Sequence, residues 1–148
     1  MKSFFLALLC IIFLYLSLNS AGDEAKKVEG VWLTGSKKAK VQIFERNGKF
    51  YGKIVWLREP KDKEGKDKMD KNNPDPKLRI KPLIGLENLT DFEYDGELEW
   101  DDGYIYDPEN GKTYSCKMWL ENDNTLNVRG YIGISLLGRT EVWLRDKL

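Results

Sequence analysis

Short runs of β-branched and aromatic residues, separated by Gly, Asn and Asp, follow one another along most of the chain. This pattern is typical of consecutive antiparallel strands. The runs at 28–34, 40–45 and 49–57 predict the first three strands. Asn47-Gly48, between the second and third runs, favours a tight hairpin turn because both residues tolerate a positive φ.

The strand pattern continues to the end of the chain. Residues 90–107 predict three short strands with turns at 95–96 and 101–103, and residues 107–144 predict three more. No long window keeps the 3.6-residue period of a helix. About eight strands with mainly short turns predict an all-β fold, a small antiparallel up-and-down β-barrel or a closely related sandwich, with little helix beyond the N-terminal segment.

One long segment, 58–79, interrupts the strands. Charged side chains of both signs and three prolines fill it, so it predicts a long, mobile surface loop. Lysines between its acidic residues would repel a cation, which argues against a calcium loop. The apolar stretch at 80–89 contains Pro82 and Gly85 and predicts a turn or irregular strand that plugs one end of the core.

The N-terminus has the organisation of a secretory signal peptide. A charged start at Lys2 precedes an apolar run, 4–18, and small residues up to Gly22. The run is about 15 residues long, short of the roughly 20 that span a bilayer. We expect residues 1–21 to be a cleaved leader, the only part to meet a membrane, and residues 22–148 to form one barrel domain exported to the periplasm or the extracellular space.

The composition narrows the function classes. Without Lys2 the chain has one more acidic than basic residue, which argues against nucleic acid as a partner because phosphate binding needs a clustered positive field. Histidine is absent, so the commonest metal ligand and the usual acid–base side chain are missing. We predict neither a metal site nor a cofactor, and the sequence argues against an enzyme without excluding one. With Cys10 in the leader, Cys116 is either a buried small hydrophobe, which we prefer, or a partner in a disulfide between molecules.

Side chains two apart on a strand share a face, which divides the last three predicted strands into two sets. We expect the core-lining set to comprise Tyr114, Cys116, Met118, Leu120, Leu126, Val128, Ile132, Thr140, Val142 and Leu144. The opposite set mixes aromatic and charged side chains: Ser115, Lys117, Trp119, Asn127, Arg129, Tyr131, Arg139, Glu141, Trp143 and Arg145.

The mixed set supplies candidate ligand-binding residues, because aromatic rings and guanidinium groups hold polar or anionic molecules by stacking and paired hydrogen bonds. The candidates are Trp119, Arg129, Tyr131, Arg139, Glu141 and Trp143. An ordinary outer barrel face is the simpler interpretation of the same pattern. If the mixed face lined the interior instead, the protein would be a carrier with a polar and aromatic cavity.

Two alternative functions use other residues. An envelope-associated interaction module would contact its partner protein through the apolar tip Ile134, Leu136 and Leu137. A carboxylate-dependent hydrolase would use acids such as Asp107 and Glu141, within about 10 Å of each other across a cleft. We assign no catalytic residue. Asn88-Leu89-Thr90 is a glycosylation sequon that matters only in a eukaryotic secretory pathway.

Three motifs resemble known families. Gly30-x-Trp32 on the first strand, with an Arg on the last, resembles lipocalin-type barrels, where the Trp closes one end against the Arg; Arg145, or else Arg139, would play that part. Two longer motifs resemble the signature of a family of small exported bacterial proteins catalogued as domain of unknown function 2147. These motifs are Asp107-Pro-Glu-Asn-Gly-Lys-Thr-Tyr-Ser-Cys116 and Val128-Arg-Gly-Tyr-Ile-Gly-Ile-Ser-Leu-Leu-Gly-Arg-Thr140.

The resemblance extends from Gly30 to Trp143 and implies a signal-peptide-bearing protein with a lipocalin-like barrel and no established activity. Many relatives carry a Cys-x-x-Cys in the loop that here runs from 61 to 77, and this chain has none. This chain therefore lacks the thiol pair on which a redox or metal role suggested for those relatives would depend. The main hypothesis is an exported barrel that binds a small amphipathic or anionic ligand without transforming it.

Overall fold

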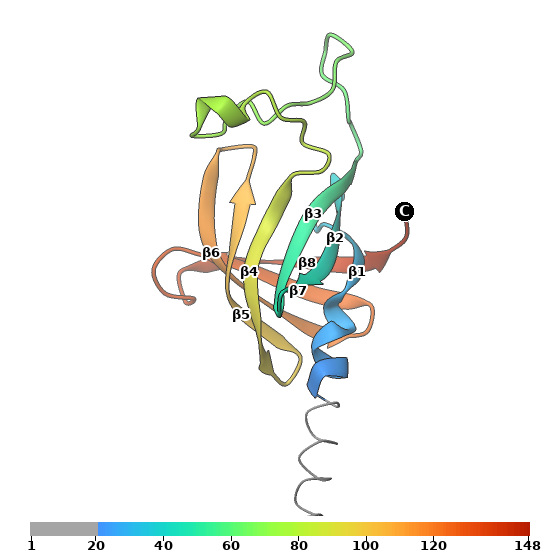
Figure 1. Ribbon diagram of the computed structural model, residues 1–148, viewed down its shortest axis with the longest axis vertical. Coiled ribbons are helices and arrows are strands. Elements are labelled where there is room, and N and C mark those ends of the chain that lie inside the picture. The colour runs from blue at the N-terminus through green and yellow to red at the C-terminus, as the bar shows by residue number, and fades with distance from the viewer. Residues whose placement is uncertain (1–20) are drawn as a thin grey trace, which may run out of the picture.

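The protein closes into an eight-stranded antiparallel barrel (Figure 1). The computed structural model describes residues 21–148. Its strands are β1 (Gly30–Leu33), β2 (Ala39–Arg46), β3 (Lys49–Leu57), β4 (Glu87–Gly96), β5 (Glu99–Asp107), β6 (Lys112–Asn122), β7 (Thr125–Tyr131) and β8 (Gly138–Asp146). Each strand pairs with the next, and β8 pairs with β1. The predicted up-and-down barrel is confirmed.

Helical structure is limited to short turns in the described part of the chain. Residues 21–25 are helical and lead into the 3-10 turn η1 (Lys26–Val28), and a second 3-10 turn, η2 (Pro76–Leu78), lies in the long loop. None of these is long and apolar enough to cross a membrane. The predicted leader, 1–21, lies outside the described residues except for Ala21.

Two-residue turns join the first hairpins, and one of them is shifted from its predicted place. Asn47 and Gly48 link β2 to β3 with φ of 54° and 79°, as predicted. Strand β4 runs through the predicted turn at 95–96, and Glu97 and Leu98 turn instead, with φ of 52° and 61°. This uncommon backbone is tolerated because Leu98 packs against the core.

The predicted turn at 101–103 is a bulge inside β5. The register against β6 shifts between Trp100 and Gly103, and Asp102 has a φ of 56°. A side chain cannot be accommodated at Gly103, because a Cβ atom there would lie 2.4 Å from the Phe92 ring. Residues 90–107 therefore belong to two long strands instead of three short ones.

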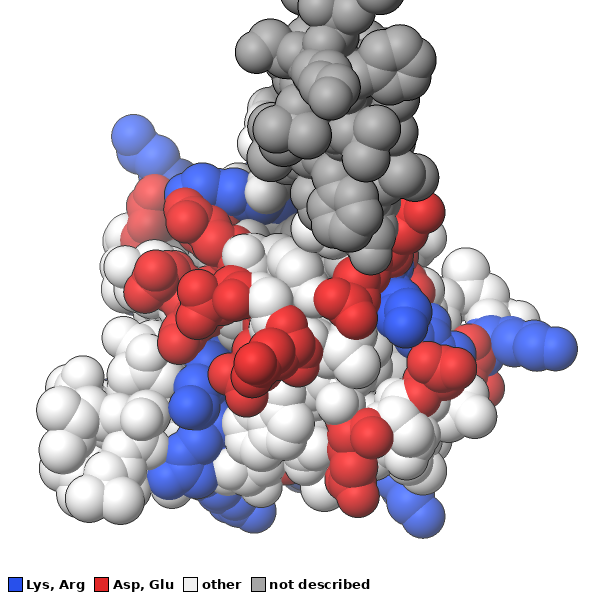
Figure 2. All heavy atoms as spheres, turned by 90° about the horizontal axis from the view of Figure 1, so that it is seen from below, with Lys and Arg blue, Asp and Glu red and all other residues white. Residues whose placement is uncertain are grey.

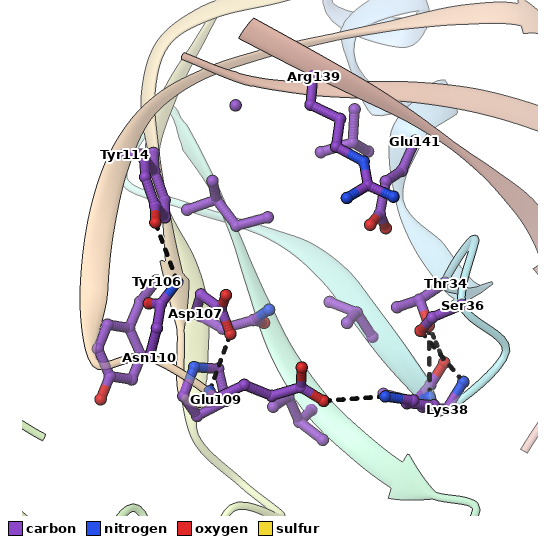
Figure 3. Close-up of a pocket in the computed structure, with 18 of the residues that line it drawn as sticks. Thr34, Ser36, Lys38, Tyr106, Asp107, Glu109, Asn110, Tyr114, Arg139 and Glu141 are labelled. Atoms are coloured by element: carbon purple, nitrogen blue, oxygen red, sulfur yellow. Dashed lines mark hydrogen bonds and ion pairs between the residues drawn. The ribbon is translucent and has the colours of Figure 1, made fainter. Parts of the chain in front are cut away.

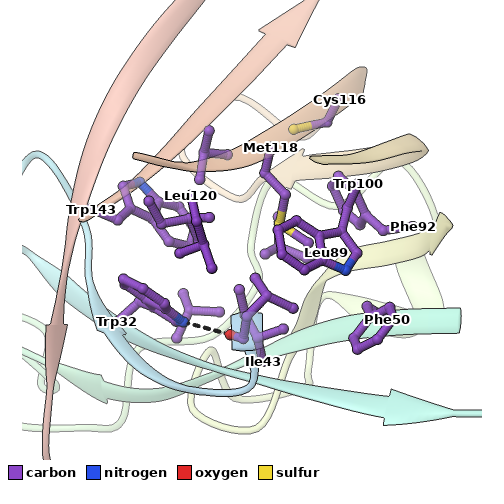
Figure 4. Close-up of a cluster of buried hydrophobic side chains, with 14 of the residues drawn as sticks. Trp32, Ile43, Phe50, Leu89, Phe92, Trp100, Cys116, Met118, Leu120 and Trp143 are labelled. Atoms are coloured by element: carbon purple, nitrogen blue, oxygen red, sulfur yellow. Dashed lines mark hydrogen bonds between the residues drawn. The ribbon is translucent and has the colours of Figure 1, made fainter. Parts of the chain in front are cut away.

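One end of the barrel is packed solid (Figure 4). We call this the closed end; it holds the β2–β3, β4–β5 and β6–β7 hairpins and the segment before β1. The buried cluster inside comprises Val28, Trp32, Val41, Ile43, Phe50, Ile54, Leu89, Phe92, Trp100, Cys116, Met118, Leu120, Leu126, Val128 and Trp143. Burying this many large apolar side chains is the main favourable contribution to the stability of the fold.

The predicted core face is right for β6 and β7 and wrong for β8. Val142 and Leu144 are each 48% exposed, whereas Trp143 is 2% exposed. Residues directly opposite in antiparallel strands share a face, and Leu126 of β7 faces Trp143. Strand β8 therefore turns its aromatic and charged side chains inward. Ile132, also expected in the core, lies beyond the end of β7 and is exposed.

The long loop between β3 and β4 is fastened to the barrel instead of lying free. Asp70 is 1% exposed, and its carboxylate accepts hydrogen bonds from the Tyr106 hydroxyl at 2.7 Å and the Asn73 amide at 2.7 Å. The Asn72 amide donates to the carbonyl oxygens of Pro108 and Glu109, both at 3.0 Å. The loop is thereby held against the β5–β6 turn.

Candidate functional site

A cavity of about 1020 Å³ opens at the end of the barrel opposite the closed end. Four loops surround it, namely 34–38 between β1 and β2, 58–59 after β3, 107–110 between β5 and β6, and 132–137 between β7 and β8. In an up-and-down barrel these connections all lie at one end, which we call the open end. The interior is therefore solid at one end and hollow at the other.

The floor of the cavity is apolar. Val41, Ile54, Val128 and Trp143 belong both to the buried core and to the cavity lining. Above this floor, the inward position on β7 is occupied by Gly130, which has no side chain. The inward residues nearer the closed end are larger. The cavity exists because the side chains that point inward become smaller or more polar towards the open end.

Strand β8 places two opposite charges in the cavity wall. Arg139 and Glu141 lie side by side and point into the cavity (Figure 3). One Glu141 carboxylate oxygen accepts a hydrogen bond from the Trp143 indole at 3.3 Å. For the Arg139 guanidinium, no hydrogen bond or ion pair is found within residues 21–148. This guanidinium is positioned to receive an acidic group from a ligand.

Asn88, at the start of β4, adds an unpaired amide to the lining. Its side chain is 8% exposed, and its Oδ1 atom has no hydrogen-bond partner in the described part of the chain. Buried polar atoms are nearly always hydrogen-bonded in folded proteins. A ligand group or a water molecule in the cavity would supply the missing bond. The same burial makes Asn88 a poor acceptor for a glycan.

Polar side chains form the rim of the cavity (Figure 3). Lys38 of the β1–β2 loop pairs with Glu109 of the β5–β6 turn at 3.2 Å, which links two sides of the mouth. The Asn110 amide donates to the Tyr114 hydroxyl at 3.0 Å. Both partners of the Lys38–Glu109 pair are well exposed, so solvent screening leaves it little strength. The pair therefore contributes little to holding the two loops together.

The six predicted ligand-binding residues are divided between the two sides of the wall. Arg139, Glu141 and Trp143 line the cavity from the inward face of β8. Tyr131 borders the cavity at the end of β7, but it pairs with Ser115 and so belongs to the outward face of β6 and β7. Trp119 lies on the outer surface beside Lys117, whose ammonium nitrogen is 5.9 Å from the indole ring centroid. The prediction treated one alternating set as one face, but β8 has the opposite inward parity to β6 and β7.

Arg129, a predicted ligand-binding residue, instead forms hydrogen bonds with the β7–β8 loop. Its guanidinium donates to the carbonyl oxygens of Ser135 at 2.7 Å and Leu136 at 3.2 Å, and to the Thr140 hydroxyl at 2.8 Å. These three bonds fix the β7–β8 loop. Arg129 therefore shapes the rim from outside and does not line the cavity.

Trp32 and Arg145, the predicted barrel-closing pair, are in contact at the closed end. The guanidinium carbon of Arg145 lies 4.2 Å from the Trp32 ring centroid. Arg145 also donates to the carbonyl oxygens of Lys27 at 2.7 Å and Glu29 at 2.8 Å, and the Trp32 indole donates to Val28 at 2.8 Å. Burial lowers the pKa of Arg145 from its ordinary value. This network ties the segment before β1 across the closed end.

The remaining reactive groups are placed as follows. Burial raises the pKa of the Cys116 thiol to about 12, and Cys116 belongs to the core cluster. Asp107 and Glu141 both line the cavity, but Asp107 also caps the β5–β6 turn by accepting from the Glu109 amide at 2.8 Å. Within residues 21–148, no three His, Cys, Asp or Glu side chains are grouped so that they could hold a metal ion.

Two residues of this region were missed by the sequence reasoning. Asn88 drew notice only as a sequon, although a polar residue that starts a buried strand is itself a signal. Asp70 stands among many loop carboxylates, and nothing in the sequence distinguishes it. Burial and the bond to Tyr106 raise the pKa of that tyrosine to about 12.

Comparisons with known proteins agree with the fold. The model of the family DUF2147, described as an uncharacterized protein conserved in bacteria, matches residues 30–145. Among solved structures, protein HP1028 from the human pathogen Helicobacter pylori, which is described as belonging to the lipocalin family, is similar with 28% identity and a TM-score of 0.69. The match covers 81% of this chain and 83% of that one. No curated protein matches the chain.

Proposed function

Since this chain belongs to the DUF2147 family of bacterial proteins and closes into a lipocalin-like barrel, we propose that it binds a small amphipathic molecule in its open half. The cavity of about 1020 Å³ is the observation that carries this proposal. Ligand pockets in proteins span roughly 300–1,000 Å³ and combine an apolar lining with a few placed polar groups. This cavity has both features.

The lining predicts how such a molecule would lie. Its apolar part would contact the floor at Val41, Ile54 and Val128. Its polar head would then reach the wall at the level of Arg139, whose guanidinium suits a carboxylate or another anionic group. Asn88 would bond to a polar atom nearer the floor. A ligand with an apolar body and an acidic head satisfies all these groups at once.

Binding without chemical change explains the cavity better than hydrolysis does. Glu141 is bonded to the Trp143 indole and Asp107 to the β5–β6 turn, so both carboxylates already have local structural partners. The thiol of Cys116 is in the core and is not part of the cavity lining. The proposal includes the predicted export, because a leader at 1–21 would deliver the carrier to the periplasm or outside the cell.

The proposal is tested with two fluorescent probes, dansyl-labelled undecanoate and its methyl ester. The wild-type protein should bind both, with a rise in dansyl emission. Arg139→Ala should weaken binding of the acid about tenfold, because a charge-assisted hydrogen bond is lost, and should leave the ester almost unchanged. Lys117→Ala, which removes a cation from the outer wall, is the matched control and should bind both probes like the wild type. Failure of the wild type to bind either probe, or equal affinities in all three proteins, would refute the assignment.

A further inference from the structure

The loop between β7 and β8, residues 132–137, exposes an apolar surface that the barrel does not need. Its four aliphatic side chains, Ile132, Ile134, Leu136 and Leu137, are between 59% and 79% exposed. No charged residue occurs from 130 to 138. Soluble proteins seldom expose contiguous aliphatic side chains in this way unless the patch contacts something else.

Hydrogen bonds to the backbone of the loop hold these aliphatic side chains in exposed positions. The three hydrogen bonds from Arg129 hold the carbonyl oxygens of Ser135 and Leu136 and the Thr140 hydroxyl. Within the loop, the Leu137 amide donates to the Ile134 carbonyl at 3.0 Å. The polar backbone is satisfied by this network, so the aliphatic side chains are left pointing outward from an ordered loop.

The loop is also part of the cavity mouth. Ile132, Leu136 and Leu137 line the cavity while remaining exposed. In Figure 1 the loop projects sideways from the barrel wall, between the ribbons of β7 and β8. The same aliphatic side chains are therefore exposed to solvent and border the cavity.

The two ends of the barrel differ in charge. Residues 93–102, in the β4–β5 hairpin at the closed end, include six Asp and Glu and no Lys or Arg. Figure 2 views the molecule from that end and shows acidic side chains gathered across it. At the open end, residues 34–38, 58–86 and 107–110 together carry eleven Lys and Arg against eight Asp and Glu. An anionic surface would attract the open end and repel the closed end.

We propose that the β7–β8 loop is a membrane-contact element, which seats the mouth of the cavity on an anionic lipid surface. Aliphatic side chains insert at the boundary between headgroups and acyl chains, and nearby basic residues add attraction to anionic lipid. The mouth then faces the bilayer, and an amphipathic molecule passes between lipid and cavity without crossing water. This contact goes beyond the proposed ligand binding and is measured without any ligand.

The test uses sedimentation with vesicles and the chain from Ala21 onward, which contains all eight strands of the closed barrel. Vesicles are either pure phosphatidylcholine or an equal mixture with phosphatidylglycerol. The wild type should sediment with the anionic vesicles more than with the neutral ones. The double variant Leu136→Asp/Leu137→Asp should lower the partition coefficient about tenfold or more. Leu144→Asp, on the outer wall of β8 at the closed end, is the matched control and should partition like the wild type.

Other binding partners of the β7–β8 loop would give different results. The membrane proposal is overturned if the wild type does not sediment with either kind of vesicle. It is also overturned if the double variant sediments with the vesicles as much as the wild type does. Size-exclusion chromatography of the same proteins covers the alternative of a second copy. A dimer that the double variant dissociates, without vesicle binding, would likewise overturn the proposal.

A second measurement does not depend on the folding of the double variant. Leu137→Cys can be labelled with an environment-sensitive dye, since Cys116 is buried and should not react. Emission should shift to the blue when anionic vesicles are added, and a dye on Leu144→Cys should not respond. An unchanged spectrum at position 137 would mean that the loop does not enter lipid.

Discussion

The closed and open ends of the barrel are built from the same eight strands, in which inward and outward side chains alternate. The two ends differ in the size and polarity of the inward side chains. At the closed end the inward side chains are large and aromatic, among them Trp32, Phe92 and Trp100, and they fill the lumen. At the open end the inward positions hold Gly130, Arg139 and Glu141, and a cavity remains. The large side chains at the closed end therefore stabilise the fold, and the open end retains a cavity.

The two ends also differ in how their loops are held. At the closed end, the segment before β1 is tied to the barrel by the buried hydrogen bond from Trp32 to Val28 and by the hydrogen bonds from Arg145 to Lys27 and Glu29. At the open end, the long loop is fastened by Asp70, while the rim is bridged by the exposed Lys38–Glu109 pair. The bonds at the rim are therefore weaker than those at the closed end.

The largest expected effect on stability comes from truncating a core side chain at the closed end. Phe92→Ala should lower the free energy of unfolding by about 3–5 kcal/mol, because a fully buried ring is replaced by a cavity. At the open end, Leu137→Ala should change it by less than about 0.5 kcal/mol, since the side chain is already exposed. Urea unfolding followed by near-ultraviolet circular dichroism measures both. Similar losses for the two variants would show that the ends are equally important for stability.

Overfilling the closed end should have the next largest effect. Gly103→Ala would place a Cβ atom 2.4 Å from the Phe92 ring, and we expect a loss of about 1–3 kcal/mol. The same change in a Phe92→Ala background should cost much less, because the clash partner is gone. A double-mutant cycle from urea unfolding tests this coupling. Equal costs of Gly103→Ala in the two backgrounds would contradict the packing explanation.

The fastening of the long loop should give a smaller, pH-dependent effect. The folded pKa of Tyr106 is raised to about 12 from an ordinary value of 10.0. The stability that this shift represents is present below pH 10 and is lost as the pH rises through the folded pKa. Tyr106→Phe should cost about 1–3 kcal/mol at neutral pH, because buried Asp70 loses a hydrogen bond.

The pH dependence separates this role from a simple loss of packing. Urea unfolding of the wild type should show a decline above pH 10 that is reduced in Tyr106→Phe. Tyr104→Phe, an exposed tyrosine on the same strand, is the control and should keep the decline. An alkaline decline of the same size in Tyr106→Phe and the wild type would argue against the loop fastening.

The smallest effect is expected at the rim. Glu109→Gln should leave the unfolding free energy within experimental error, because the pair with Lys38 is exposed and screened by solvent. If the rim opens for ligand, the same variant should speed the association of the dansyl-labelled probe, which stopped-flow fluorescence measures. A clear loss of stability would mean that the rim is a structural part of the barrel.

Local patterns were enough to predict the fold class. Alternating apolar residues and the Asn47-Gly48 turn gave most strands and the β2–β3 hairpin correctly, because these depend on neighbours in the chain. The bulge at Gly103 was taken for a turn, since only the Phe92 ring on the neighbouring strand β4 shows why a glycine is needed there. The contact of Trp32 with Arg145 was anticipated from a family resemblance and not from physical reasoning.

Part of the candidate site could also be predicted. Arg139, Glu141 and Trp143 share one face by their spacing alone, and the structure turns that face inward. Arg129 belongs to the same pattern but donates hydrogen bonds to the β7–β8 loop. This could not be predicted, because its partners are the backbone carbonyl groups of Ser135 and Leu136, and any residue type has such a group.

The sequence by itself determined most of the strands, the Asn47-Gly48 turn and the mixture of aromatic and charged side chains that alternate along the last strands. Only the tertiary structure decided which face of β8 points inward, because that choice depends on the pairing of Leu126 with Trp143 between different strands. The position of Asp70 and the cavity above Val128 are likewise decided by contacts between distant segments. The period of a strand is a local property, whereas its orientation in a closed barrel is set by its neighbours.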